Sequence, residues 1–317
     1  MGRRAAECIL HGIVTTIVVM MLLRTQRIRA PQTRLRFWLF AMSVPLVGTP
    51  LLWLLAPWRL GESFRDEWAL FSGSHLSPWA WHGAGIAASV AWLLAMAGAA
   101  LFLRDAVPFA LDFSLGRATK RTVTAPSAVL VGAAERAAAA LGVAVPRLVV
   151  LASKHPMLIC RGLRKPVIVA STGLCEMLVP DELGAAIAHE MVHVKHRDPM
   201  LGWGLMLVRG LSFFNPAVQL AARAVVVEIE RRADQSAARI VGSSQYLVDS
   251  LRKLSGSAAA SHTARSWHVF RLAAIEERCQ ALLREQKNDK PDLPGPSPWI
   301  LLTTALGLGA ILFLTVA

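Results

Sequence analysis

A His-Glu-x-x-His motif is the part of the sequence best suited to chemistry, and it consists of His189, Glu190 and His193. Residues four positions apart lie on one face of a helix, so both imidazoles can bind the same metal ion. Histidine nitrogen is a preferred zinc ligand in tetrahedral sites. Glu190 can hold a water molecule beside that metal and accept its proton. The motif therefore predicts hydrolysis by a zinc-activated water molecule.

A second segment, VEIERRAD, can complete the metal site. A catalytic zinc needs a third protein ligand and an open fourth position. Glu230 and Asp234 are four residues apart and share a helix face, whereas Glu228 points roughly 200° away from Glu230. We expect Glu230, with its longer side chain, to bind zinc. We expect Asp234 to accept a hydrogen bond from the nitrogen of His189 that does not bind zinc.

The zinc motif must lie on a well-formed helix. The sequence predicts a helix from Pro180 toward His196, with Asp181 as its cap and Glu182 in its first turn. His196, at the helix end, is expected to be exposed to solvent. Asp198-Pro199 is typical of the start of a following helix, with the aspartate as cap.

A small sheet is expected before this helix. Arg147–Ala152 and Pro166–Ala170 are short runs rich in β-branched residues, and CRGLRKP between them is typical of a turn. A substrate peptide is expected to lie along Pro166–Ala170 as an added strand. Further helices are predicted at Ser127–Leu141 and over a stretch containing Ala273–Glu285.

The composition indicates a membrane protein. Hydrophobic residues make up 54% of the chain and charged residues 17%, which excludes a disordered chain and argues against a simple soluble enzyme. Four runs lack Asp, Glu, Lys and Arg, and each is close to the ~20 residues of a spanning helix. They are Cys8–Leu23, Phe37–Ala56, Pro78–Leu103 and Pro298–Ala317. A signal peptide is the alternative for the first run. The four cysteines include no CxxC pair, so neither a disulfide framework nor a thiolate zinc site is expected.

Charges between the apolar runs predict the orientation. The loop 24–36 carries five arginines and no acid, so it should face the cytoplasm. Such loops explain most of the net charge of +13, and no basic stretch interleaved with aromatic residues indicates nucleic-acid binding. We expect a multi-pass protein of the cell membrane, with three spans in residues 1–103, a cytoplasmic domain in 104–297 and a fourth span in 298–317.

The expected fold class is therefore a polytopic α-helical membrane protein whose catalytic domain is mainly helical, of α+β type, with a small β-sheet. Met200–Val227 is strongly apolar, but both of its flanks carry residues of the predicted site and must lie on the same side of the membrane. We expect two short helices here, hinged at Asn215-Pro216, that pack against the bilayer or dip into it.

Several segments together resemble the BlaR/MecR-type membrane metallopeptidases, the zinc-peptidase part of bacterial β-lactam sensor-transducers. The matching stretches are GLRKPVIV, AAIAHEMVHVKHRDP, FFNP, EIERRAD and ERCQALL. The resemblance implies a gluzincin, a zinc peptidase with HExxH and ExxxD motifs, and the CAAX-protease and HtpX-like enzymes are wider relatives. The transducers continue after their last span into an extracellular penicillin-binding domain. This sequence ends at Ala317, so we expect no β-lactam-receptor role.

The resemblance also implies a candidate for transition-state stabilisation. Related gluzincins use a downstream histidine to support the oxyanion, and such a donor is worth ~3 kcal/mol of barrier. His268 is the preferred candidate here, ahead of His262, with surface histidines as the alternative. Arg278, in ERCQALL, is expected to form a structural salt bridge or to pair with an acid near the site.

The expected function is a membrane-embedded zinc endopeptidase that cleaves a cytoplasmic or membrane-proximal protein, with that protein and the lipid bilayer as partners. One alternative is an antirepressor-type signal transducer whose proteolysis is limited to itself or one repressor, with a repressor or a separate sensor protein as partner. Another is a quality-control protease for membrane proteins. An inactive scaffold is disfavoured, because HExxH and ExxxD are both intact.

The orientation can be tested by cysteine labelling in intact cells. Cysteines introduced near Gly61 should react with an impermeant thiol reagent, because the loop around this residue should be external. Cysteines introduced near Lys120 or Asn288 should react only after lysis. Labelling near Lys120 in intact cells would overturn the predicted orientation.

Overall fold

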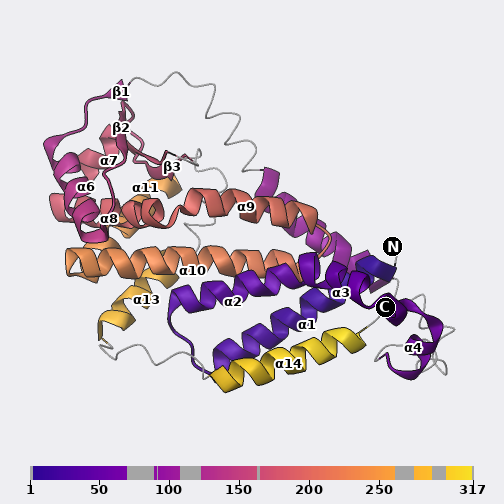
Figure 1. Cartoon of the computed structure of the whole chain (residues 1–317). Helices are drawn as coiled ribbons and strands as arrows, with labels where there is room; N and C mark the ends of the chain where they lie inside the picture. The colour runs from indigo at the N-terminus through magenta and orange to yellow at the C-terminus, as the bar shows by residue number, and fades with distance from the viewer. Residues whose placement is uncertain are drawn as a thin grey trace. The chain divides into compact units, whose positions relative to one another are not determined.

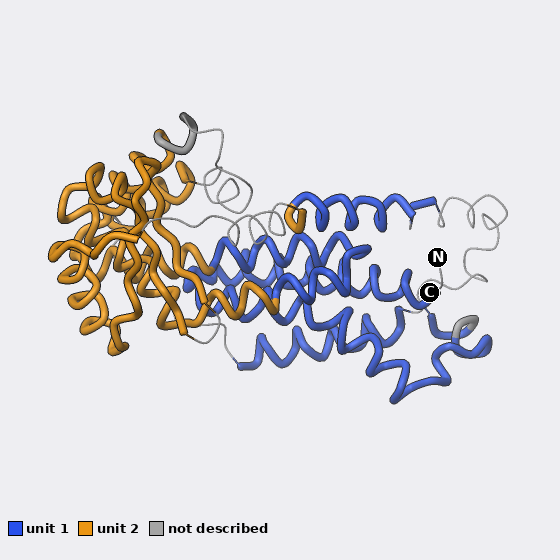
Figure 2. The backbone as a smooth tube through the Cα atoms, turned by 90° about the horizontal axis from the view of Figure 1, so that it is seen from above, with its two compact units in different colours: residues 1–104, 205–228, 292–317 blue, residues 105–204, 229–291 orange. Residues whose placement is uncertain are grey.

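The computed structural model describes residues 3–69, 89–90, 92–107, 123–162, 165–260, 275–287 and 298–315. The chain divides into two compact units, which Figure 2 colours separately. Unit 1 comprises Met1–Arg104, Leu205–Glu228 and Asp292–Ala317, and unit 2 comprises Asp105–Gly204 and Ile229–Pro291. The expected domain 104–297 differs from unit 2 chiefly in residues 205–228, which group with unit 1.

Unit 1 is built mainly from apolar helices (Figure 1). Its elements are α1 (Arg3–Thr25), α2 (Pro31–Ser43), the π-helical turn η1 (Val44–Gly48), α3 (Thr49–Leu55), the 3-10 turn η2 (Pro57–Leu60), α4 (Glu62–Glu67) and α14 (Pro298–Leu314). Two helical stretches, Arg4–Thr25 and Pro31–Leu55, are long and apolar enough to cross a membrane. They coincide with the first two predicted spans. In the third, residues 78–88 and 91 lie outside the described residues, and α14 is a shorter apolar helix.

A buried polar cluster joins three parts of unit 1. Arg59 in η2 is fully buried, and its guanidinium donates to the carbonyl oxygens of Phe313 at 2.6 Å and Leu312 at 3.0 Å, at the end of α14. Glu7 in α1 accepts from the same guanidinium at 3.3 Å. A helix end leaves its last carbonyls without partners, so Arg59 supplies the missing donors. The pairing fixes the end of α14 beside the start of α1.

Helices α9 (Asp198–Leu211) and α10 (Pro216–Val241) meet at the predicted Asn215-Pro216 break. The side chain of Asn215 accepts from the amide of Ala217 at 3.1 Å and donates to the carbonyl of Cys8 at 2.8 Å. Gly12 permits this approach, because a Cβ there would lie 2.7 Å from Nδ2 of Asn215. The prediction of two short helices is wrong for α10. It has 26 residues, because no Gly or Pro follows Pro216 until Gly242.

Unit 2 contains a four-stranded sheet in the order β1-β2-β4-β3. The strands are β1 (Val123–Thr124), β2 (Arg147–Leu151), β3 (Leu158–Arg161) and β4 (Val167–Ser171). β4 pairs in parallel with β2 and antiparallel with β3. Two expectations are corrected. Cys160 and Arg161 belong to a strand rather than a turn, and β4 has neighbours on both edges, so no peptide can add to Pro166–Ala170.

Four helices share one core with this sheet, and two of them, α7 and α8, contact its strands (Figure 1). They are α6 (Ala128–Leu141), α7 (Thr172–Met177), α8 (Pro180–His196) and α11 (Ser244–Ala260), with α13 (Ile275–Lys287) against α11. One face of the sheet joins the helices in a single core, through residues such as Val150, Ile168 and Ala170. α8 is the central helix of this core, since α6, α11 and β3 all contact it.

The start of α8 differs in detail from the prediction. Asp181 is exposed in the first turn and is not the cap, since the helix begins at Pro180. Glu182 lies three residues after Val179 and accepts from the Val179 amide at 3.1 Å. This contact satisfies an amide at the start of the helix that would otherwise lack a partner. Lys253 on α11 also donates to Glu182, at 2.6 Å, and thereby ties the start of α8 to α11.

Candidate metal centre

Helix α8 brings His189, Glu190 and His193 together on one side. All three are buried, with exposed fractions of 4%, 4% and 6%, and one ligand atom from each lies within 4.8 Å of the others. The two Nε2 atoms of the histidines are 3.1 Å apart. The spacing of the motif therefore places the three side chains as the sequence predicts.

Glu230 on α10 lies opposite the two histidines. Its carboxylate oxygens are 3.4 Å from Nε2 of His189 and 3.8 Å from Nε2 of His193. Ligand atoms of a tetrahedral zinc with bonds of ~2.0–2.1 Å lie about 3.3 Å from one another. The two Nε2 atoms and the nearer Glu230 oxygen of each thus lie at spacings close to those that zinc requires, and the donor set fits this metal.

A carboxylate contacts the Nδ1 atom of each histidine and thereby orients the ring. Nδ1 of His189 lies 3.0 Å from Oδ1 of Asp234, and Nδ1 of His193 lies 2.8 Å from Oδ2 of Asp198. A carboxylate accepts, so each Nδ1 carries a hydrogen and each Nε2 lone pair is directed at the space between the rings. Two lone pairs 3.1 Å apart repel each other unless a cation or proton lies between them. This is the chemistry of a metal-binding pair.

The pKa of His189 also supports a metal-binding role for this histidine. Burial alone would lower its pKa, but hydrogen bonds to Asp234 and Glu230 outweigh burial and raise the pKa of His189 to about 9. The imidazolium is therefore favoured in the metal-free protein. A metal ion must displace this proton, so its apparent affinity should rise with pH up to about 9.

Arg278 on α13 contacts both acids of the site. Its guanidinium donates to the two carboxylate oxygens of Asp234 at 2.6 and 2.8 Å, and Nη1 lies 3.1 Å from Oε2 of Glu230. Against the effect of burial, Arg278 and His189 hold the pKa of Asp234 below its usual range. Asp234 thus stays ionised and able to accept from His189. Of the two roles expected for Arg278, the structure shows pairing with acids beside the site.

The sequence did not reveal the position of Asp198. This residue begins α9, directly after Arg197, whose φ of 54° turns the chain at the end of α8. The turn returns the carboxylate to His193, and Arg232 on α10 pairs with the other oxygen of Asp198 at 2.5 Å. In the sequence, Asp198-Pro199 was interpreted as the start of a helix. The only sequence signal for the contact with His193 was that Asp198 follows this histidine by five residues.

Other predicted residues lie elsewhere. His262 and His268 fall outside the described residues. His196 is exposed at the end of α8, as expected. Glu228 points away from the histidines and is buried, and it forms an ion pair with Arg34 at the start of α2. The side chain of Glu228 therefore has a structural partner that the sequence did not suggest.

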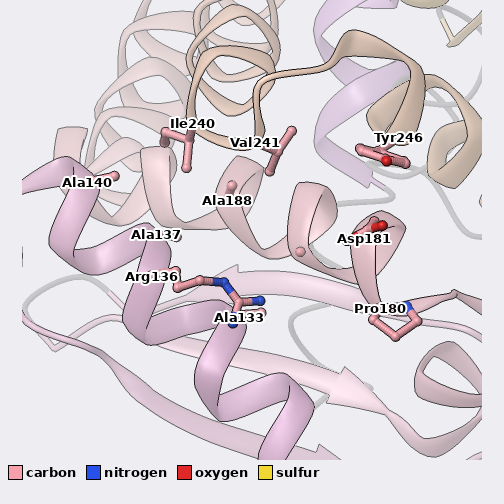
Figure 3. Close-up of a pocket in the computed structure, with 11 residues that line it drawn as sticks. Ala133, Arg136, Ala137, Ala140, Pro180, Asp181, Ala188, Ile240, Val241 and Tyr246 are labelled. Atoms are coloured by element: carbon pink, nitrogen blue, oxygen red, sulfur yellow. The ribbon is translucent and has the colours of Figure 1, made fainter.

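A pocket of about 260 Å³ lies on another side of α8 (Figure 3). Its walls come from α6, α8, the end of α10 and α11, with Arg136, Asp181 and Tyr246 as polar lining residues. None of the residues that line it is a predicted metal ligand. The pocket is therefore separate from the candidate metal centre.

Comparison with known proteins agrees with this geometry. The model of the BlaR1 peptidase M56 family matches residues 89–282, which include all the residues of the candidate centre. The chain belongs to this peptidase family. The resemblance to BlaR/MecR-type metallopeptidases is thereby confirmed. A protease HtpX homolog from Caldanaerobacter subterraneus subsp. tengcongensis is 33% identical over 110 residues. That match covers 34% of this chain and 37% of the relative, little more than a third of its length.

Family membership and the two apolar N-terminal helices together support a membrane-associated metallopeptidase. The candidate centre supplies residues that can hold the metal on which such enzymes typically depend. It lies on α8 and α10, whose bounds fall wholly inside the matched residues.

Substitutions of the four acids should separate metal binding from stability. Glu230→Ala should remove zinc, because it deletes the third ligand. Asp198→Ala and Asp234→Ala should each weaken zinc binding ~10–100-fold by freeing a ligand histidine. Glu228→Ala should retain zinc but lower the unfolding temperature, because Arg34 loses its partner. A chelator-competition titration and a thermal melt measure both effects. Loss of zinc in Glu228→Ala with retention in Glu230→Ala would refute the assignment of the third ligand.

Proposed function

We propose that the protein is a zinc endopeptidase that cleaves a cytoplasmic or membrane-proximal protein. One observation carries this proposal. Two histidines, each held by a carboxylate at Nδ1, face Glu230, whose carboxylate oxygens lie 3.4 and 3.8 Å from their Nε2 atoms, with Glu190 beside them. His189, His193 and Glu230 would hold the metal. When bound, zinc would supply a Lewis acid that polarises the peptide carbonyl and makes water acidic enough to lose a proton near neutral pH.

The protein's own groups would carry out the remaining steps. Glu190 would accept a proton from water at its carboxylate and would later deliver a proton to the amine that leaves. Asp198 and Asp234 would hold the histidine rings in the required tautomer. The burial of Glu190 supports this role, since it keeps the carboxylate away from bulk water.

The edge of the sheet is the proposed site for the substrate backbone. Among the described residues, β3 lies at one edge of the sheet and contacts α8, the helix of the HExxH motif. An extended peptide can add to such an edge through main-chain hydrogen bonds. We therefore propose β3, rather than the central strand β4, as the strand to which a substrate peptide adds.

The proposal includes how the chain crosses the membrane and which side its peptidase part faces. We propose a multi-pass protein of the cell membrane with the peptidase part facing the cytoplasm, as the five arginines of the loop 24–36 indicate. The second candidate function is antirepressor-type signalling with cleavage of the protein itself or one repressor, and the family match supports it. A quality-control protease for membrane proteins is the third candidate function.

Glu190→Gln tests the catalytic assignment. The variant keeps the proposed ligands, so it should bind zinc as the parent protein does and yet lose peptide cleavage, because no group then accepts the proton of water. Metal analysis and a cleavage assay on the purified full chain measure the two properties. Full activity in Glu190→Gln would exclude this residue as the base, and zinc-independent cleavage by the parent would exclude the proposed function.

The same variant can identify the substrate. A peptidase that binds but does not cleave should retain its substrate during purification, and mass spectrometry can then name it. A single repressor among the retained proteins would favour the signalling alternative. Many unrelated membrane proteins would favour quality control.

A further inference from the structure

The turn between α1 and α2 carries positive charge that the fold of unit 1 leaves largely uncompensated. Residues 24–36 contain five arginines, and no Asp or Glu occurs between Glu7 and Glu62. One of the five, Arg34, pairs with Glu228. The other four are exposed, and none of their side chains has an acidic partner among the described residues. These four form the arginine cluster, which consists of Arg24, Arg27, Arg29 and Arg36.

Hydrogen bonds hold the turn that carries the arginine cluster in a defined shape. Nη1 of Arg34 donates to the carbonyl of Ile28 at 3.2 Å, and the amide of Ile28 donates to the carbonyl of Leu23 at 3.2 Å. Arg27 has a φ of 48°, a left-handed conformation that glycine adopts more easily than other residues do. The sequence thus places an arginine where glycine would fit the backbone better. This choice indicates a use for the charge of Arg27.

Exposed apolar side chains continue from the arginine cluster along both helices. On α1, Ile17 and Met21 are exposed and precede Arg24 at the spacing of one helix face. On α2, Phe40 is exposed and follows Arg36 by about one turn. The two helices contact each other and run in opposite directions (Figure 1). On both helices, therefore, the exposed apolar side chains begin at the end where the arginines lie.

A phospholipid has both of the features that this surface calls for. Its phosphate oxygens accept hydrogen bonds from guanidinium groups, and its acyl chains can cover exposed apolar side chains of a spanning helix. Long basic side chains near the end of such a helix extend toward the headgroup region. Clusters of Lys and Arg beside a spanning helix favour lipids whose headgroups carry a net negative charge.

We propose that the arginine cluster binds the headgroup of an anionic phospholipid whose acyl chains lie along α1 and α2. The inference rests on the proposed crossing of the membrane by these helices, but not on which side the turn faces. One basic residue near a charged membrane surface contributes up to about a fivefold preference. Loss of one arginine should therefore lower the preference for anionic over zwitterionic lipid by up to about fivefold. Salt should weaken the preference, because the arginines are exposed.

An acidic protein segment fits this surface less well than a lipid does. Such a segment would pair with the arginines but would leave the exposed side chains of Ile17, Met21 and Phe40 in water. A lipid covers these side chains and pairs with the arginines in one molecule. The arrangement of charge beside apolar surface therefore favours the lipid.

Native mass spectrometry of the full-length protein in a neutral detergent tests the proposal. The protein is mixed with equal amounts of phosphatidylglycerol and phosphatidylcholine that have identical acyl chains, and the ratio of the bound lipids is measured. The parent protein should prefer phosphatidylglycerol. Arg24→Gln and Arg36→Gln should each lower the ratio by up to about fivefold, whereas Arg24→Lys should keep most of it. Arg136→Gln is the matched control, because Arg136 is an exposed arginine of unit 2 without an acidic partner among the described residues.

Inorganic phosphate distinguishes a lipid site from a site for phosphate alone. At matched ionic strength, sodium phosphate should displace the bound lipid no more than sodium chloride does, because the acyl chains contribute to binding. Displacement specific to phosphate would assign the arginine cluster to a soluble anion and would overturn the inference.

Further outcomes separate the inference from the proposed membrane arrangement. Release of the protein from cell membranes by alkaline carbonate would count against the membrane arrangement itself. If the protein stays in the membrane, equal binding of both lipids, or an unchanged preference in Arg24→Gln and Arg36→Gln, would overturn the inference alone. An equal loss of preference in Arg136→Gln would indicate a general effect of net charge and would also overturn it. Binding of an acidic peptide in place of lipid, abolished by Arg24→Gln, would assign the arginine cluster to a protein partner.

Discussion

The close approach of two imidazoles is the constraint on which the centre depends. Nε2 of His189 and Nε2 of His193 lie 3.1 Å apart inside the protein, with both Nδ1 atoms engaged by carboxylates. Such an arrangement is unfavourable without a positive charge between the rings. A metal ion or a proton must supply that charge, and Glu230 completes the set of groups around it. The surrounding structure serves to maintain this approach.

Each restraint on the histidines comes from a different element. Asp198 acts from the start of α9, Asp234 from α10, and Arg278 of α13 holds Asp234 ionised. α8 itself is fixed at its start by Glu182 and Lys253. α10 carries both Glu230 and Asp234, which lie one turn apart on the same helix. Displacing α10 would therefore move Glu230 away from α8.

The sequence revealed the parts of the centre that depend on local spacing. HExxH and ExxxD each lie within one helix, so a period of 3.6 residues was sufficient to place His193 beside His189 and Asp234 on the face of Glu230. Contacts over long sequence separations were not accessible in this way. Glu228 pairs with a residue 194 positions away, and Arg278 reaches Asp234 across 44. β3 was missed because its four residues include Cys160 and Arg161 and lack a clear alternation.

X-ray absorption at the zinc edge of the purified, zinc-loaded protein tests the central claim most directly. The account predicts one zinc ion with only nitrogen and oxygen neighbours at ~2.0–2.1 Å, including the scattering pattern of two imidazoles. Four cysteines are present in the chain, so the spectrum can distinguish the proposed ligands from thiolates. A sulfur neighbour at ~2.3 Å from zinc would contradict this account of the metal site. An unchanged spectrum in the Glu230→Ala variant would contradict it as well.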